Sequence, residues 1–123
     1  MTWEAPETSP YPVLTLQFTS DALNNTGAMA VATAAGWFFG GNLANPSSTD
    51  AAVVQFYDEV AGSVVIGSNL LWSVVVPPSE SMPIDLARPL RFFTALSVAA
   101  VGGWLRAGAG AVNSNITAHL EYS

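Results

Sequence analysis

The chain has 123 residues, of which half are hydrophobic and only 10% are charged, and its three arginines and nine acidic residues give a formal net charge of −6. A chain of this length is expected to form one domain. So few basic residues argue against DNA or RNA as a partner, because phosphate binding needs a clustered basic surface. There is no cysteine, which excludes disulfides and thiolate metal sites and fits folding in a cytoplasm.

The surface cannot be of the usual charged kind, because the chain contains no lysine. Soluble monomers normally intersperse charges of both signs over their surface. Interfaces between subunits are depleted in lysine and glutamate and enriched in aromatic residues. We therefore expect much of the surface to be covered by further copies of the chain or by a larger assembly.

Two uncharged stretches, Gly27–Gly41 and Phe92–Leu105, raise the question of membrane insertion. At 15 and 14 residues, both are shorter than the roughly 17–25 residues that a helix needs to cross a bilayer. The first twelve residues have acids and prolines where a secretory signal would have a basic start and an apolar core. The sequence predicts neither a membrane span nor a secretory signal, and a small two-span membrane protein is the alternative.

Residues 1–12 are expected to form an extended arm, because their three prolines rule out a helix and weaken a paired strand. Trp3 and Tyr11 are large residues to leave on a free tail. We expect the arm to pack against its own domain or against a neighbour. The domain itself is expected to cover residues 13–123.

The first half of this domain alternates between strand and turn patterns. Val13–Thr19 has the period of two that predicts a strand, and Ser20–Gly27 has turn residues. Ala28–Ala35 suits a helix by its alanines or a strand by its context, and we favour the strand. Trp37–Leu43 predicts a strand with a bulge at Gly40-Gly41. The expected exposed loop tips are Asn24–Gly27 and Asn45–Asp50.

The centre of the chain, Ala51–Val76, has the pattern of a hairpin. Ala51–Asp58 predicts a half-buried strand that has one oily face and one mixed face. Asp58–Gly62 supplies the turn, in which Gly62 can take a positive φ, and Val64–Ile66 begins the return strand.

The last third predicts further strands and turns. Prolines at 77 and 78 place a turn after Val76, because neither can donate to a strand ladder. Residues 82–86 and Leu96–Val101 predict strands, Ala87–Phe92 predicts a corner, and Gly102–Gly110 predicts a mobile or tightly bent loop. Asn115–Tyr122 alternates most regularly of all. About eight or nine short strands indicate an all-β fold, an antiparallel β-sandwich of jelly-roll or immunoglobulin-like type.

Residues for catalysis are few. The one histidine, His119, falls on the polar face of the last strand, where a solvated side chain is the simpler interpretation. The acids Asp50, Asp58 and Glu59 belong to loops and turns, where solvation and turn geometry explain them. No phosphate loop or EF-hand pattern is present. We therefore predict no catalytic residues, no cofactor and no metal site, with a calcium site in the acidic loops as a minor alternative.

The phenylalanine pairs 38-39 and 92-93 predict a different feature. Neighbouring residues on a strand point to opposite faces. One member of each pair must therefore lie at an interface, an edge or a bulge.

From Ala51 onward the chain resembles a family. It runs AAVVQFYD, a hairpin, LLWSVVVPPSESMPIDL, RPLRFFTALSVAAVGG and a closing NITAHLEYS. This succession is similar to small β-sandwich virion proteins of tailed bacteriophages, with their V-x-F-Y-D strand, V-P-x-x-x-S, R-F-x-x-x-L-x-V and alternating last strand. The resemblance covers about the last two-thirds of the chain and bears on fold more than on function.

The resemblance implies a non-enzymatic capsid decoration, or cement, protein that binds the major capsid protein or another virion protein. It would be folded in the host cytoplasm, act in the virion and form homo-oligomers, with burial of apolar surface repeated over a symmetric shell. The expected contact residues are Trp3, Tyr11, Trp104 and Arg106. The alternative is a tail or fibre module that binds host glycan or a receptor, with Trp104 near Asn113 and Asn115 as its candidate cluster.

Overall fold

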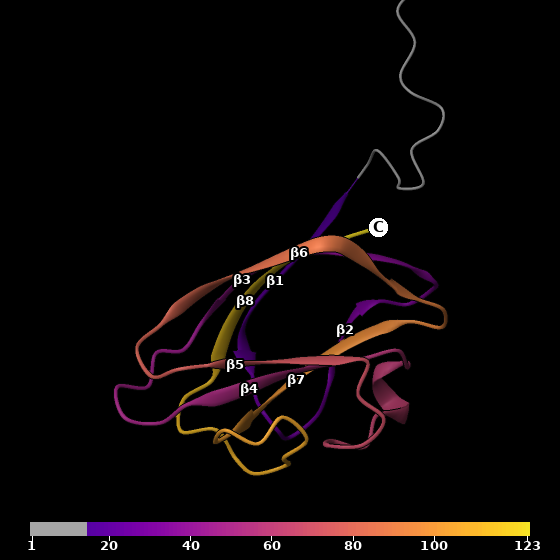
Figure 1. Cartoon of the computed structure of the whole chain (residues 1–123). Coiled ribbons are helices and arrows are strands. Elements are labelled where there is room, and N and C mark those ends of the chain that lie inside the picture. The colour runs from indigo at the N-terminus through magenta and orange to yellow at the C-terminus, as the bar shows by residue number, and fades with distance from the viewer. Residues whose placement is uncertain (1–14) are drawn as a thin grey trace, which may run out of the picture.

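Antiparallel strands account for most of the alternation in the sequence (Figure 1). The computed structural model describes residues 15–123. Within them no helix is long and apolar enough to span a bilayer. The elements are β1 (Leu16–Leu23), β2 (Met29–Ala32), β3 (Gly36–Ala44), β4 (Ala52–Tyr57), the 3₁₀ helix η1 (Ala61–Ser63), β5 (Trp72–Val76), β6 (Ser81–Phe92), β7 (Leu96–Gly102) and β8 (Ile116–Tyr122).

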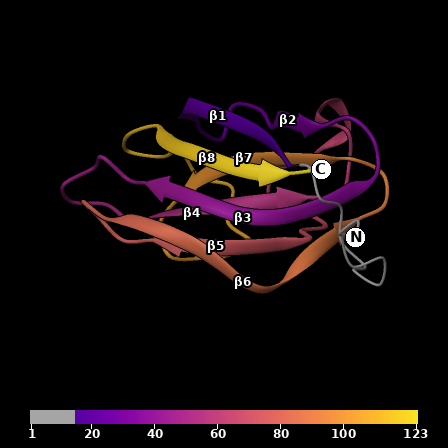
Figure 2. The ribbon, with the colours of Figure 1, turned by 90° about the horizontal axis from the view of Figure 1, so that it is seen from above.

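The strands form two sheets, one with the order β1-β8-β3-β6 and the other with the order β2-β7-β4-β5. The pairs β1–β8, β2–β7, β3–β6 and β4–β5 are all antiparallel, as in a long hairpin wound around a common core. Figure 1 shows the sheets stacked as two layers, and Figure 2, seen from above, shows one sheet lying over the other. This connectivity is that of an eight-stranded jelly roll and differs from the immunoglobulin order. The predicted antiparallel β-sandwich is confirmed.

The core lies between the two layers and is built from the inward residues of every strand. The ring of Phe38 on β3 meets that of Phe56 on β4 with centroids 4.8 Å apart, and Phe56 also contacts Trp72 on β5 at 5.5 Å. Ile116, Ala118 and Leu120 of β8 are buried while Thr117 and His119 are exposed. The alternation predicted for the last strand is therefore confirmed.

The outer faces of the two sheets differ. On the β1-β8-β3-β6 sheet the outward side chains include exposed Thr19, Asn42 and His119. On β4 every residue is buried, so the prediction of a half-buried strand there was wrong. Two loops, 58–71 and 103–115, fold over the outward residues of β4, and Gly67 of the first loop lies against Ala107 and Gly108 of the second.

Two local predictions are confirmed. Ala28–Ala35 contains the strand β2. The glycine bulge in β3 is present as well, because the register of β3 shifts against both neighbours between Phe38 and Gly40. Gly40 and Gly41 have φ of 115° and 150°, which side chains with a Cβ rarely adopt.

Other boundaries were predicted wrongly. Val64–Ile66 is loop, the return strand begins only at Trp72, and Gly62 lies at η1 without a positive φ. Ala87–Phe92 is part of β6 and not a corner, since β6 runs on to Phe92 and its register shifts between Asp85 and Leu90. β6 tolerates its two prolines because it is an edge strand. β1 extends through Asp21 to Leu23, so the first turn is shorter than Ser20–Gly27.

Candidate functional site

The four residues predicted to contact a partner fall into two groups. Trp3 and Tyr11 lie outside the described residues. Trp104 and Arg106 lie in the glycine-containing loop between β7 and β8, where both are exposed.

That loop is tightly held against the sheet. The fully buried Gln55 of β4 donates from Nε2 to the backbone carbonyls of Arg106 and Gly108, at 3.0 and 2.8 Å. The hydroxyl of Tyr57 donates to Oε1 of Gln55 and accepts the N–H of Gly67 at 2.9 Å. Burial raises the pKa of Tyr57, and nearby Glu59 raises it further, against the opposing hydrogen bond from Gly67. A buried polar pair thus ties both covering loops to β4.

Arg106 also bonds to its own fold. Its Nη1 atom donates to the backbone carbonyl of Ser73 at 2.6 Å. Ser73 lies on β5, an edge strand, whose open backbone groups are a template for unwanted strand pairing. The guanidinium covers part of that edge, so Arg106 has a structural role.

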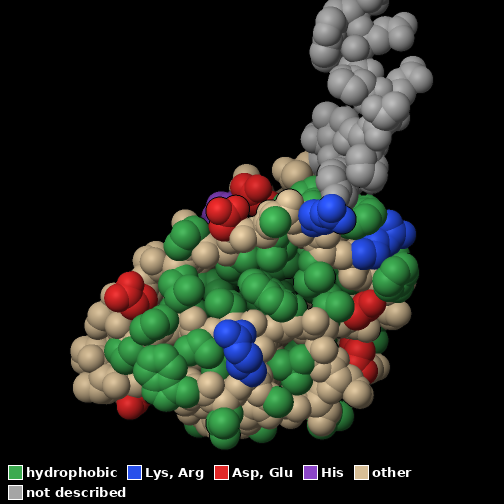
Figure 3. Space-filling model, in the orientation of Figure 1, with side chains coloured by type: hydrophobic (Ala, Val, Ile, Leu, Met, Phe, Trp, Pro, Cys, Tyr) green, Lys and Arg blue, Asp and Glu red, His purple; other side chains and the backbone are tan. Residues whose placement is uncertain are grey.

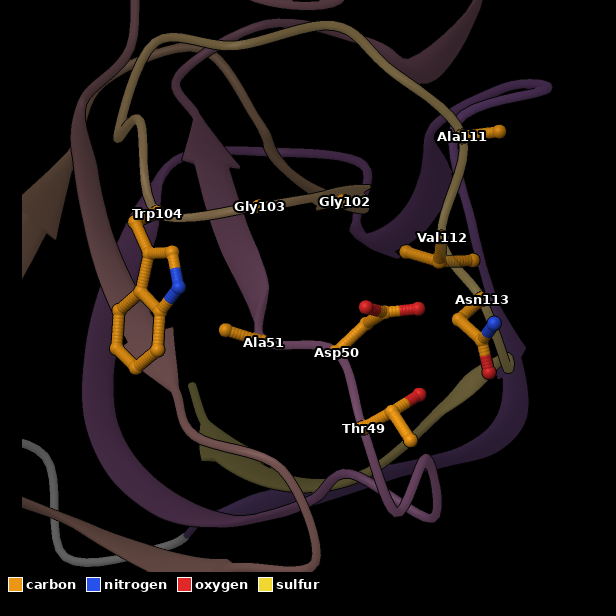
Figure 4. Close-up of a pocket in the computed structure, with 9 residues that line it drawn as sticks. All are labelled: Thr49, Asp50, Ala51, Gly102, Gly103, Trp104, Ala111, Val112 and Asn113. Carbon is orange, nitrogen blue, oxygen red and sulfur yellow. The ribbon is translucent and has the colours of Figure 1, made fainter.

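Trp104 forms one wall of a cavity of about 360 Å³, which we call the Trp104 groove (Figure 4). Figure 4 shows the indole on one side and the side chains of Asp50, Thr49 and Asn113 on the other, with the backbone of residues 102–103 between them. The indole is 63% exposed. Gly103 has φ of 96° and no atom within 4 Å of the place where a Cβ would stand. One wall is therefore aromatic, the opposite wall is polar, and the backbone between them is open.

The polar wall is fixed by a buried network in the loop after β3. Ser47 donates from Oγ to Oδ1 of Asn113 at 3.0 Å and accepts the N–H of Asp50 at 3.0 Å. Asn45 accepts the N–H of Ser47 and donates to the carbonyl of Asp50 at 2.9 Å. Asn45 and Ser47 are each only 3% exposed, so the prediction that Asn45–Asp50 is simply an exposed tip was wrong at these two positions.

Of the cluster proposed from the sequence, the structure brings together Trp104 and Asn113 but not Asn115. Oδ1 of Asn115 accepts a bond from Nδ2 of Asn24 at 3.3 Å, and Asn115 does not line the groove. Asp50 and Thr49 take its place.

A second surface lies at the other end of β4. The guanidinium carbon of Arg91 stands 4.9 Å from the ring centroid of Trp37 and 5.4 Å from that of Phe93. Phe93 is 73% exposed, whereas Phe92 is fully buried. The predicted split of this phenylalanine pair is confirmed, and we call Trp37, Arg91 and Phe93 the Phe93 patch.

Asp58 holds the turn that carries this patch. Its carboxylate accepts the backbone N–H groups of Phe93, Thr94 and Ala95 at 2.8, 2.8 and 3.2 Å. Burial acts to raise the pKa of Asp58, but the three hydrogen bonds together outweigh it, so this pKa lies below its usual value. The position of Phe93 is therefore set by a charged side chain from the β4 end.

An apolar band runs along the open side of the sandwich, between the edge strands β5 and β6. Figure 3 shows hydrophobic side chains gathered there between the two strands, with few charges among them. Partly buried residues of this side pack on the core: Trp72, Val74, Met82, Leu86 and Leu90. We call these five residues the β5–β6 band, and β6 leads from it to Arg91 and the Phe93 patch.

Catalytic and metal-binding arrangements do not emerge from the described part of the chain. His119 is exposed on the outer face of its sheet, with Thr19 and Asn42 as its strand neighbours. Residues 15–123 hold no group of three or more histidine, cysteine or acidic side chains placed to bind a metal ion. Asp58, one of the acids weighed from the sequence, is occupied by backbone hydrogen bonds.

Comparison of the chain with models of protein families, with curated proteins and with solved structures finds no match.

Proposed function

We propose that the protein is a structural component of a bacteriophage virion, a capsid decoration protein that binds the major capsid protein. The jelly roll is a frequent architecture of viral capsid proteins, and the resemblance of the chain from Ala51 onward favours the same class. A fold alone does not determine a function, so the proposal depends on the surface.

The observation that carries the proposal is an apolar band that leads to an exposed aromatic residue, Phe93. The β5–β6 band lies along the edge strands of the two sheets, and β6 ends at the Phe93 patch. Interfaces between virion proteins are expected to be rich in aromatic residues and arginine and poor in lysine, which agrees with a chain that has no lysine at all. Shell proteins or neighbouring copies would cover this side.

The described chain begins at the end of the sandwich where the Phe93 patch lies. Leu16 pairs with Tyr122, Tyr122 with Phe38, and Ser123 bonds to Trp37 through both backbone groups. Residue 15 therefore lies at the same end of the sandwich as the Phe93 patch. Residues 1–12, which lie outside the described part of the chain, would extend the contact onto a neighbour through Trp3 and Tyr11.

A binding experiment tests the proposal with a matched pair of variants. Phe93→Glu places a charge on the proposed contact, and Val65→Glu places one on an apolar side chain that is 66% exposed elsewhere. Particles purified from a host that carries the gene, and stripped of the protein, should bind the wild type and Val65→Glu equally. Phe93→Glu should bind at least about tenfold more weakly, a cost of about 1.4 kcal/mol. Equal binding by both variants would reject the Phe93 patch as the contact.

Deletion of residues 1–12 tests the arm. The truncated protein should keep the unfolding midpoint of the full chain and occupy fewer sites on the particle. Full occupancy by the truncated protein would refute the role of the arm.

A further inference from the structure

We propose that the Trp104 groove binds a neutral saccharide, as a function separate from attachment to the particle. The groove lies beside Ala51 just before the start of β4, while Asp58 and the Phe93 patch lie at the end of that strand. Six strand residues at about 3.3 Å each separate the two by about 20 Å. This distance separates the groove from the Phe93 patch, whereas the β5–β6 band runs back toward the groove end, where Met82 pairs with Leu43. A partner whose contact is centred on the Phe93 patch can therefore leave the groove accessible.

The aromatic wall suits the apolar face of a sugar ring. A pyranose has one face made largely of C–H groups, and an exposed indole offers a flat apolar surface of matching kind. The indole is free to contact a ligand because it does not belong to the core, and Trp104 is 63% exposed. The open backbone at Gly103 lets a ring approach closely, since nothing stands where a side chain would begin.

The opposite wall carries groups that hydrogen-bond hydroxyls. Within residues 15–123 the carboxylate of Asp50 forms no hydrogen bond, and Nδ2 of Asn113 has none either, because only Oδ1 is used by Ser47 and Ser114. A carboxylate accepts and an amide nitrogen donates, so the pair can bind adjacent hydroxyls of one sugar. The volume of about 360 Å³ falls in the usual range of small-molecule pockets, about 300–1,000 Å³.

The geometry is already set before a ligand arrives. Ser47 links the Asp50 backbone to the Asn113 side chain, while the N–H of Gly103 donates to the carbonyl of Ala51 at 2.9 Å. The N–H of Gly102 donates to the carbonyl of Gly110 at 3.0 Å. The backbone beside Trp104 and the polar wall are thus held in place, which lowers the entropy lost on binding.

The charge of the groove selects among ligands. No lysine or arginine lines it, and Asp50 does, so phosphorylated and carboxylated sugars would be repelled. Cationic ligands such as quaternary amines favour cages of several aromatic rings, and Trp104 is the one aromatic residue that lines this cavity. A neutral saccharide fits both conditions.

The test uses the full chain without any particle, so its result is independent of the proposed attachment to a capsid. Glucose, galactose, mannose and N-acetylglucosamine are first screened by saturation-transfer NMR, together with an array of neutral oligosaccharides. The best ligand is then titrated against ¹⁵N-labelled protein. The protein signals of the Trp104 indole N–H and the Asn113 side-chain amide should shift, and the indole signals of Trp37 and Trp72 should not change position.

Three variants decide the outcome. Trp104→Ala should weaken binding about tenfold or more, and Asp50→Ala should weaken it severalfold, with no change in unfolding midpoint because neither side chain supports the fold. Leu105→Ala is the control, since this neighbour is 76% exposed and does not line the groove. Failure of every neutral saccharide to bind would overturn the proposal. So would binding that survives Trp104→Ala, or binding only to charged glycans or quaternary amines.

Discussion

Replacing Asp58 tests whether one carboxylate holds the turn that presents the Phe93 patch. In Asp58→Ala all three acceptor contacts are lost. Ala95 is fully buried, so its N–H would lack a partner at a cost of about 1–3 kcal/mol. The N–H groups of Phe93 and Thr94 are on exposed residues and can bond to water instead, so the loss of each of these two hydrogen bonds should cost only about 0.5 kcal/mol. We expect a total loss of about 2–4 kcal/mol in the free energy of unfolding.

Asparagine at this position separates charge from geometry. Oδ1 accepts from Thr94 and Ala95, and Oδ2 accepts from Phe93. Asp58→Asn keeps the first atom as an acceptor and places an amide against the N–H of Phe93, so its cost should be smaller, about 1 kcal/mol. Asp85→Asn is the control, because this carboxylate is exposed on β6 and forms no hydrogen bond within residues 15–123.

The pH dependence follows from the direction of the shift. The pKa of Asp58 is lower in the folded state than in the unfolded chain, so the ionised carboxylate stabilises the fold above the unfolded-state pKa of about 4. This contribution is lost as the pH falls through that value toward the folded-state pKa. Urea unfolding followed by tryptophan fluorescence should give a gap between wild type and Asp58→Asn that narrows from about pH 6 to about pH 3. A gap that does not change with pH, or an Asp58→Ala variant as stable as the wild type, would refute this account of the turn.

Three further predictions concern the sheets and their cover. Gln55→Ala should destabilise the fold by about 2–4 kcal/mol, because it opens a cavity and leaves the Tyr57 hydroxyl and two loop carbonyls without their hydrogen-bond partner. Amide hydrogen exchange should become faster at residues 104–110, and unchanged exchange there would contradict this prediction. Gly40→Ala should cost about 3 kcal/mol in a thermal unfolding experiment, because a Cβ would collide with the Ile84 carbonyl at φ of 115°, whereas Gly62→Ala, with nothing within 4 Å, should be neutral or slightly stabilising. Arg106→Ala should increase self-association, measured by light scattering, because it uncovers the β5 edge at Ser73. Arg88→Ala is the control, since it removes the same charge from an exposed residue of β6. An equal increase in both variants would show that net charge, and not the β5 edge, causes the effect.

Much of the fold was predictable because it depends on local alternation. The period of two in residues 115–122, the apolar run at 96–101 and the aromatic stretch at 37–43 each correspond to a strand, and the glycines at 40 and 41 marked a bulge. Pattern alone could not separate a jelly roll from an immunoglobulin-like sandwich, because that choice lies in which distant strands pair. Residues 64–66 have the composition of a strand but lie in the loop that follows η1 and covers β4. Tertiary context overrides their strand propensity.

The site was predictable only in part, because its polar wall comes from a different segment than its aromatic wall. The exposure of Trp104 and its closeness to Asn113 were within reach of the sequence, since both lie in one loop. Asp50 and Thr49 are more than fifty residues away from Trp104, and only the pairing of β4 with β7 brings them alongside. The run Asn45-Pro46-Ser47-Ser48 was a signal for side chains that bond to nearby backbone, but it could not show that Ser47 would reach Asn113.

Cryo-electron microscopy of purified virions that carry the protein tests the central claim most directly. The account predicts jelly-roll density at repeated positions on the capsid shell, with the β5–β6 band and the Phe93 patch against the major capsid protein or a neighbouring copy and the Trp104 groove facing outward. Density confined to the tail, or density oriented with the Trp104 groove against the shell, would contradict it.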